Sequence, residues 1–127
     1  MKTKVINADI ILCDRVIENG ECIYEDGIIV SVGRNLPKCE NVIDAEGGIL
    51  VPGFVDIHCH CGVGLSFMGG SVDDFASIAK FHLAHGTTTL VATTCTSDDD
   101  ETIGMIETCA EYMKNGEDPT VVGVFME

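Results

Sequence analysis

The sequence contains no tryptophan and few basic side chains, because only seven lysines and arginines stand against 21 aspartates and glutamates. The formal net charge is −14 at pH 7, and no segment supplies the basic surface that nucleic acid or an anionic membrane requires. No stretch approaches the ~20 apolar residues of a membrane span. Asp9 and Asp14 interrupt the apolar core that a signal peptide would need. We therefore expect a cytoplasmic protein that binds neither nucleic acid nor membranes.

Proline is also scarce, with three residues, whereas hydrophobic residues make up 46% of the chain and exclude a disordered polar tail. The 127 residues allow one ordinary domain or a piece of a larger one. Seven cysteines form an odd number without the spacing of a disulfide framework. Reduced thiols are the simpler interpretation, and they agree with a cytoplasmic location.

Short apolar runs separated by turn residues fill the chain up to about residue 50. They favour short antiparallel strands, and Asp26-Gly27 is the strongest hairpin signal in the sequence. The runs that carry this prediction are 5–6, 10–12, 22–24 and 28–33.

Beyond this region the pattern changes to strands that alternate with helices, which is typical of an α/β protein with a parallel sheet. A Ser-x-x-acid capping pattern at Ser71 marks the start of the first helix. A closed barrel takes eight strand–helix units and ~250 residues, so we expect the chain to be a fragment. The predicted strands are 49–60, 87–94 and 121–125, and the predicted helices are 71–85 and a segment from 97 to Asn115-Gly116.

Two histidines at the end of the first of these strands are the main candidate for chemistry. His58 and His60 are two residues apart, so they share one face of a strand, whereas Ile57 and Cys59 should point to the opposite face. Imidazole is a common zinc ligand, and such a pair supplies half of a tetrahedral site. The plain alternative is a pair of histidines that merely sits at a strand end.

A carboxylate follows the third strand at the corresponding place. In a barrel, Glu127 would converge with the two histidines on the same rim, where it could complete one metal site or bridge two ions. The alternative is an acidic side chain that is simply solvated.

Several motifs in order along the chain resemble the N-acetylglucosamine-6-phosphate deacetylases of the amidohydrolase superfamily. The segment 25–29 and the motif Val-Pro-Gly-Phe-Val-Asp-Ile-His-Cys-His at 51–60 carry the resemblance to the superfamily. The motifs that follow narrow it to the deacetylases, and the resemblance spans nearly the whole chain. These later motifs lie at 62–64, 67–68, 81–89, 93–94 and 123–127.

This resemblance implies a (β/α)8 TIM barrel beside a small β-sandwich, of which only the N-terminal part is present. Residues 1–50 would form the first strands of the sandwich, and residues 51–127 the first three strands and two helices of the barrel. It also implies one or two divalent ions, with zinc favoured over iron, manganese or cobalt. His58 and His60 would be ligands, and Glu127 would be a ligand that bridges where two ions are present. The catalytic aspartate is expected beyond residue 127, so no catalytic residue is assigned within the chain.

The implied reaction is metal-dependent hydrolysis of the acetamide of N-acetylglucosamine 6-phosphate to glucosamine 6-phosphate and acetate. The implied substrate is thus a small amino sugar phosphate, and a homodimer or homotetramer is expected for the full-length protein. Alternatives are a cyclic amidase, an adenine-deaminase-like enzyme, or a non-catalytic fragment. Cyclic amidases typically carry a carboxylated lysine on the fourth strand, so a glutamate after the third strand argues against them.

Four further residues invite a functional reading. Cys61 replaces the glycine that usually follows the second histidine in the family, and its thiolate could bind zinc. A small buried hydrophobic side chain is the commoner role of a free cysteine. His82 and His85 lie near the end of the first helix, where a structural role is favoured. Thr87 begins a threonine run that is best explained by strand packing.

Overall fold

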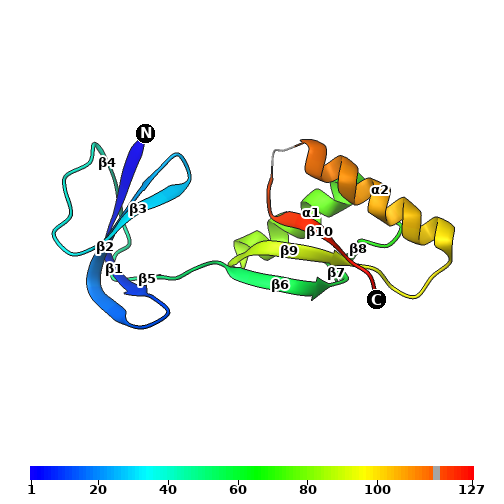
Figure 1. The fold of residues 1–127 in the computed structure, drawn as a ribbon, viewed down its shortest axis with the longest axis horizontal. Coiled ribbons are helices and arrows are strands. Elements are labelled where there is room, and N and C mark those ends of the chain that lie inside the picture. The colour runs from blue at the N-terminus through cyan, green and yellow to red at the C-terminus, as the bar shows by residue number, and fades with distance from the viewer. Residues whose placement is uncertain (116–117) are drawn as a thin grey trace. The chain divides into compact units, whose positions relative to one another are not determined.

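The computed structural model describes residues 1–115 and 118–127, which divide into two compact units, Met1–Pro52 and Gly53–Glu127 (Figure 1). Each unit has its own buried hydrophobic cluster. The described chain is mixed α/β with strands in the majority of its elements.

The first unit is a five-stranded sheet in the order β3-β2-β1-β4, with β5 paired to β1. The predicted antiparallel pairing is confirmed for β1, β2 and β3. The sheet also contains β4, which none of the predicted runs includes, and β5, and both run parallel to β1. The runs 5–6 and 10–12, which looked separate in sequence, belong to one strand. The bounds are β1 Lys2–Ile11, β2 Val16–Glu25, β3 Ile28–Gly33, β4 Asn41–Asp44 and β5 Ile49–Leu50.

The predicted hairpin at Asp26-Gly27 joins β2 to β3. Both residues have positive φ, 50° and 80°, as a two-residue turn of the type favoured in hairpins requires. Ala8, Ile10 and Cys22 are the buried centre of this unit. The turn therefore folds β3 back so that the strands share one small core.

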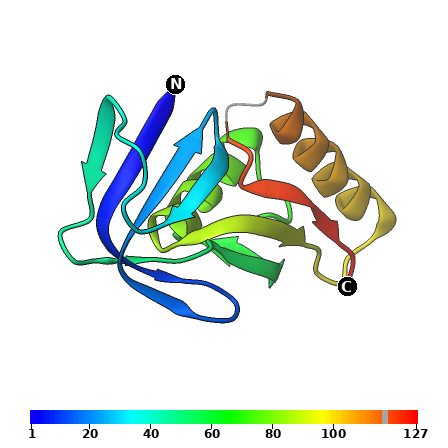
Figure 2. The ribbon, with the colours of Figure 1, turned by 60° about the vertical axis from the view of Figure 1, so that its left-hand side comes forward.

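The second unit is a three-stranded parallel sheet in the order β10-β9-β6, with two helices (Figure 2). This confirms the alternation predicted from the sequence. The predicted strand over 49–60 is wrong as a single element, because 49–50 pair with β1 and the next strand starts at Phe54. The two segments belong to different sheets, and Pro52, which lacks an amide hydrogen for strand pairing, lies between them. The bounds are β6 Phe54–Cys59, β7 Cys61–Gly62, β8 Leu65–Ser66, α1 Val72–Ala84, β9 Thr87–Thr93, α2 Asp99–Asn115 and β10 Val121–Phe125.

Side chains cap the first turn of both helices. Ser71 and Asp74 form the predicted capping box of α1 with reciprocal side-chain to backbone hydrogen bonds. At the start of α2, Asp98 Oδ1 accepts a hydrogen bond from Glu101 N at 2.9 Å. The predicted end of the second helix includes Gly116, which lies outside the described residues.

One hydrophobic cluster holds the helices against the sheet. Phe75 and Ile78 of α1, Met105 of α2 and Leu90 of β9 are all at most 2% exposed. Burial of such side chains stabilises a fold by roughly 1.5–3 kcal/mol each. The helices therefore pack on the same face of the sheet. The residues directly after β6 and β10 are not members of this cluster.

Close backbone packing at Gly53 generates a first prediction. A Cβ at this position would lie 1.9 Å from Thr88 Oγ1 and 2.6 Å from Thr88 Cβ. Rotation of the threonine side chain moves Oγ1 but leaves Cβ in place, so the backbone itself must shift. We expect Gly53→Ala to lower the free energy of unfolding by about 1–3 kcal/mol in urea titrations. Gly123→Ala is the matched control, because nothing lies within 4 Å of its added Cβ; equal stability of the two variants would contradict the packing argument.

Tyr112 of α2 generates a second prediction. Its hydroxyl is buried and has no partner at hydrogen-bond geometry among the described residues, although the Asp118 carboxylate lies near enough to act on its pKa. Burial, with a smaller contribution from the charge of Asp118, raises the pKa of Tyr112 to about 12. In the unfolded chain the tyrosine has its ordinary pKa of about 10, so it ionises at lower pH than in the folded chain. The resulting contribution to stability is complete below pH 10 and is lost as the pH rises toward about 12.

We expect Tyr112→Phe to be as stable as the parent chain at pH 7, or more stable by up to about 1 kcal/mol, because it removes an unsatisfied hydroxyl. The variant should also lose less stability between pH 10 and 12, which urea midpoints at both pH values measure. A parallel decline of both proteins would show that Tyr112 does not control this range.

Candidate metal centre

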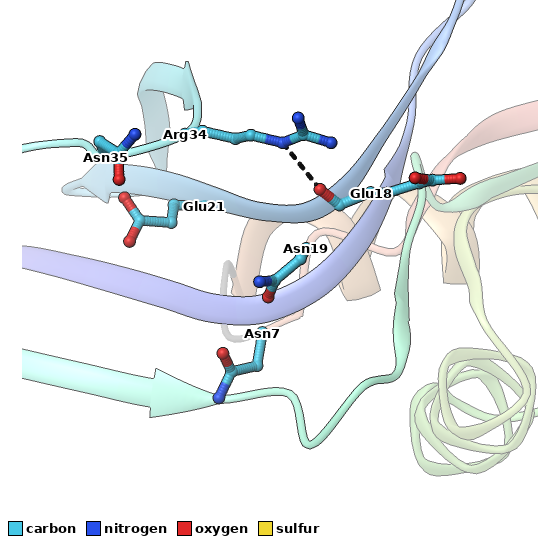
Figure 3. Close-up of a pocket in the computed structure, with 6 residues that line it drawn as sticks. All are labelled: Asn7, Glu18, Asn19, Glu21, Arg34 and Asn35. Atoms are coloured by element: carbon cyan, nitrogen blue, oxygen red, sulfur yellow. Dashed lines mark hydrogen bonds between the residues drawn. The ribbon is translucent and has the colours of Figure 1, made fainter.

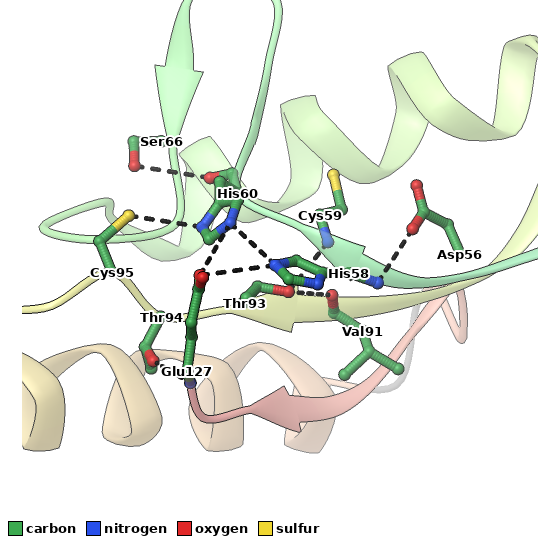
Figure 4. Close-up of polar contacts among 10 residues, drawn as sticks. All are labelled: Asp56, His58, Cys59, His60, Ser66, Val91, Thr93, Thr94, Cys95 and Glu127. Atoms are coloured by element: carbon green, nitrogen blue, oxygen red, sulfur yellow. Dashed lines mark hydrogen bonds and ion pairs between the residues drawn. The ribbon is translucent and has the colours of Figure 1, made fainter.

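The structure brings together the three residues predicted as metal ligands. His58 Nε2 lies 3.2 Å from His60 Nε2 and 3.4 Å from Glu127 Oε2, and His60 Nε2 lies 3.3 Å from the same oxygen (Figure 4). The three ligand atoms thus form a nearly equilateral triangle. Segments almost 70 residues apart in sequence meet here because β6 and β10 flank β9 in a parallel sheet.

Local contacts hold the segments that carry Glu127 and His58. Glu127 N donates a hydrogen bond to Thr94 Oγ1 at 3.0 Å, and Thr94 N donates to Phe125 O at 3.0 Å, so the chain after β10 is tied to the end of β9. On the other side, the imidazole of His58 packs against Phe125 with ring centroids 5.1 Å apart. His58 N also donates to Asp56 Oδ1 at 3.0 Å.

The donor set fits a divalent ion. Ligand atoms at 2.0–2.1 Å from a tetrahedral zinc are separated by about 3.3–3.4 Å, close to the three distances observed. The side chains of His58, His60 and Glu127 are 50%, 35% and 51% exposed, so an ion bound here would keep an open position. The same distances also fit a metal-free network in which the imidazoles donate hydrogen bonds to the carboxylate.

Cys95 is a residue that sequence reasoning missed. Its Sγ lies 3.4 Å from His60 Nδ1, the ring nitrogen that does not face the cluster (Figure 4). Histidines that bind metal usually hold this second nitrogen in a hydrogen bond that fixes the orientation of the ring. Its position just after the second strand of a parallel sheet was a signal that could have identified it.

Cys59 and Ile57, which were predicted to share the face of β6 opposite the two histidines, differ in burial. Cys59 is buried in the core, where burial raises the pKa of its thiol, whereas Ile57 is 66% exposed. The pairing of β6 with β9 shifts register between Asp56 and Cys59, so strict alternation fails there. Sequence periodicity carries no signal for such an irregularity.

The remaining candidates lie outside the triangle. The exposed Cys61 belongs to neither of the two groups of potential ligands found among the described residues. His85 follows α1 as its C-cap, with Nδ1 2.8 Å from Phe81 O, which agrees with a structural role. His82 Nε2 instead lies 3.4 Å from Cys59 Sγ, in the second group of potential ligands with Asp56.

A polar pocket of about 400 Å³ lies within the first unit (Figure 3). Arg34 Nε donates to Glu18 O at 2.9 Å across its wall. A hydrogen bond from Lys4 lowers the pKa of Glu21, which also lines the pocket. The lining offers amides, carboxylates and one guanidinium but no histidine or thiol, and both groups of potential metal ligands among the described residues lie in the second unit. The lining residues are Asn7, Glu18, Asn19, Glu21, Arg34 and Asn35.

No known protein-family profile matches the chain. Curated relatives include adenine deaminase of Bacillus subtilis, 41% identical over 91 residues that cover 61% of this chain and 14% of the relative. Dihydropyrimidinase of Rattus norvegicus is 36% identical over 78 residues, which cover 56% of this chain and 15% of the relative.

Solved structures give a more uniform result. N-acetylglucosamine-6-phosphate deacetylase of Pasteurella multocida matches 99% of this chain with a TM-score of 0.90 at 22% identity. The corresponding deacetylase of Mycobacterium smegmatis matches all of it with a TM-score of 0.78 at 27% identity. The predicted resemblance is confirmed. The chain is similar to part of these N-acetylglucosamine-6-phosphate deacetylases, and the sequence matches to deaminases and a dihydropyrimidinase support the amidohydrolase superfamily as a whole.

The chain spans only a part of each protein that it resembles. It covers 34% and 35% of the two deacetylases and about one seventh of the two curated relatives. Activity, substrate and assembly of the whole protein are therefore matters for proposal. None of the described helices is long and apolar enough to cross a membrane.

The triangle predicts the effect of ligand removal. We expect His58→Asn or His60→Asn to weaken zinc binding at this cluster by about tenfold or more, since even outer contacts to metal ligands contribute 10- to 100-fold. Equilibrium dialysis with elemental analysis measures the zinc bound per chain. His85→Asn is the matched control, because His85 lies outside both groups of potential ligands. Unchanged zinc binding in both ligand variants would show that the assignment is wrong.

Proposed function

We propose that this chain is part of a metal-dependent amide hydrolase that removes the acetyl group of N-acetylglucosamine 6-phosphate. The observation that carries the proposal is the triangle of His58, His60 and Glu127 at the ends of two parallel strands. The structural similarity to two deacetylases over almost the whole chain supports this substrate over the nucleobases and cyclic amides of the sequence relatives.

The residues present suit this chemistry. His58 and His60 would hold the ion through Nε2, with Cys95 supporting the ring of His60 through Nδ1. Glu127 would add a carboxylate ligand and reduce the net charge of the centre. When bound, the divalent ion, zinc or alternatively iron, manganese or cobalt, lowers the pKa of water and polarises the acetyl carbonyl.

The proposed enzyme needs groups that this chain does not supply. A general base, expected from the family resemblance to be an aspartate, would accept a proton from water and pass it to the leaving amine. The substrate phosphate needs cationic partners, whereas the chain carries a net charge of −14. Both are expected from sequence beyond Glu127 or from a second subunit of a homodimer or homotetramer.

The proposal extends to a TIM barrel. Phe54 and Val55 of β6 and Val122 of β10 are 48–64% exposed, although they belong to strands of a parallel sheet. Parallel sheets are normally covered on both faces, so additional strands and helices would bury these side chains. Seven free cysteines favour a reducing cytoplasm as the place of action.

The test is the product released by the protein with its sequence beyond Glu127 included. We expect acetate from N-acetylglucosamine 6-phosphate, much less from the sugar without phosphate, and no ammonia from adenine. His58→Asn should lower acetate release at least about 100-fold, whereas His85→Asn should leave it unchanged. Ammonia from adenine, or ring opening of a dihydropyrimidine without acetate release, would favour the other superfamily activities and overturn the proposed substrate.

A further inference from the structure

A second group of potential ligands lies on the side of β6 that faces α1. Asp56, Cys59 and His82 each offer a ligand atom within 4.8 Å of the other two. Cys59 Sγ is 3.4 Å from His82 Nε2. Asp56 and Cys59 project from the same side of β6 in Figure 4, away from the His58–His60–Glu127 triangle.

The irregularity of β6 creates this arrangement. Residues three apart in a regular strand point to opposite faces, so Asp56 and Cys59 would be separated. The register shift between them turns both toward the last turn of α1, where His82 lies. Cys59 is 7% exposed, and Asp56 and His82 are half-buried, so the group is sheltered but remains in reach of solvent.

The distances match the edges of a metal polyhedron. With zinc–sulfur bonds of about 2.3 Å and zinc–nitrogen bonds of about 2.0–2.1 Å, sulfur and nitrogen ligands lie about 3.6 Å apart. The Cys61 carbonyl oxygen lies 3.3 Å from His82 Nε2 and 3.5 Å from Cys59 Sγ. These three atoms therefore form a triangle of potential ligand atoms. Asp56, whose ligand atom lies within 4.8 Å of those of Cys59 and His82, is the candidate for a fourth donor.

We propose that Asp56, Cys59 and His82, with the carbonyl of Cys61, bind a thiophilic divalent ion such as zinc. A thiolate, an imidazole and a carboxylate together suit zinc better than magnesium or calcium, which prefer oxygen ligands alone. On binding, the Cys59 thiol releases its proton to solvent and the sulfur bonds to the ion, while His82 binds as the neutral imidazole. The alternative is a metal-free network of hydrogen bonds among the same atoms.

Cobalt(II) distinguishes the two, because a thiolate bound to cobalt gives a strong charge-transfer band in the near ultraviolet and the His58–His60–Glu127 triangle contains no sulfur. The chain is reduced with a phosphine, freed of metal and titrated with cobalt(II). We expect one band per chain that persists in the His58→Asn/His60→Asn double variant. This result is independent of the proposed hydrolysis, since failure of one leaves the other unchanged.

Variants locate the ligands. Cys59→Ser should abolish the band, and His82→Asn should weaken cobalt binding about tenfold or more, whereas His85→Asn should have no effect. Circular dichroism shows whether the buried Cys59→Ser variant is folded. If it is unfolded, cobalt binding is compared in His82→Asn and Asp56→Asn instead, because these two side chains are only half-buried.

The exposed thiols of Cys61 and Cys95 are the necessary controls, because Cys95 lies beside His60. Cys61→Ser and Cys95→Ser should retain the band. No band in the parent chain, a band that survives in Cys59→Ser, or its loss in either control variant would overturn the proposed site.

Discussion

Parallel pairing of β6, β9 and β10 is the constraint on which the candidate centre depends. Parallel strands end at the same edge of a sheet, so residues that follow them meet although they are distant in sequence. Phe125 pairs with Thr93, and Cys59 pairs with Ala92, so the ends of β6 and β10 lie on either side of the end of β9. The helices make this pairing stable, because their apolar faces are buried against one side of the sheet.

Much of the second unit could be predicted from the sequence because its signals are local. Each signal involves residues that are close together in the sequence. They are the capping box at Ser71, the apolar spacing of the helices and the β-branched residues of β9. The convergence of His58, His60 and Glu127 followed from topology alone. Their role as metal ligands stays a prediction, because the distances fit both an ion and hydrogen bonds.

The features that were not predicted depend on long-range contacts. The pairing of β5 with β1 joins segments 40 residues apart, which the sequence does not signal, so the strand-like run over 49–60 looked like one element. The position of Cys95 beside His60 depends on how two strand ends meet. The register shift in β6 reflects pairing with β9, and no periodicity in 54–59 reveals it.

That shift has a chemical consequence, because it lets one strand present different donors on its two sides. The imidazoles of His58 and His60, with a carboxylate, form an open and exposed set whose donor types are those of several divalent ions. The thiol of Cys59, with His82, forms a sheltered set that selects for softer ions. Asp56 connects the two sides, since it belongs to the sheltered set and also accepts a hydrogen bond from His58 N. One hydrogen bond therefore joins the carboxylate of the sheltered set to the backbone of the first histidine, and it is the contact through which the two sides of β6 meet.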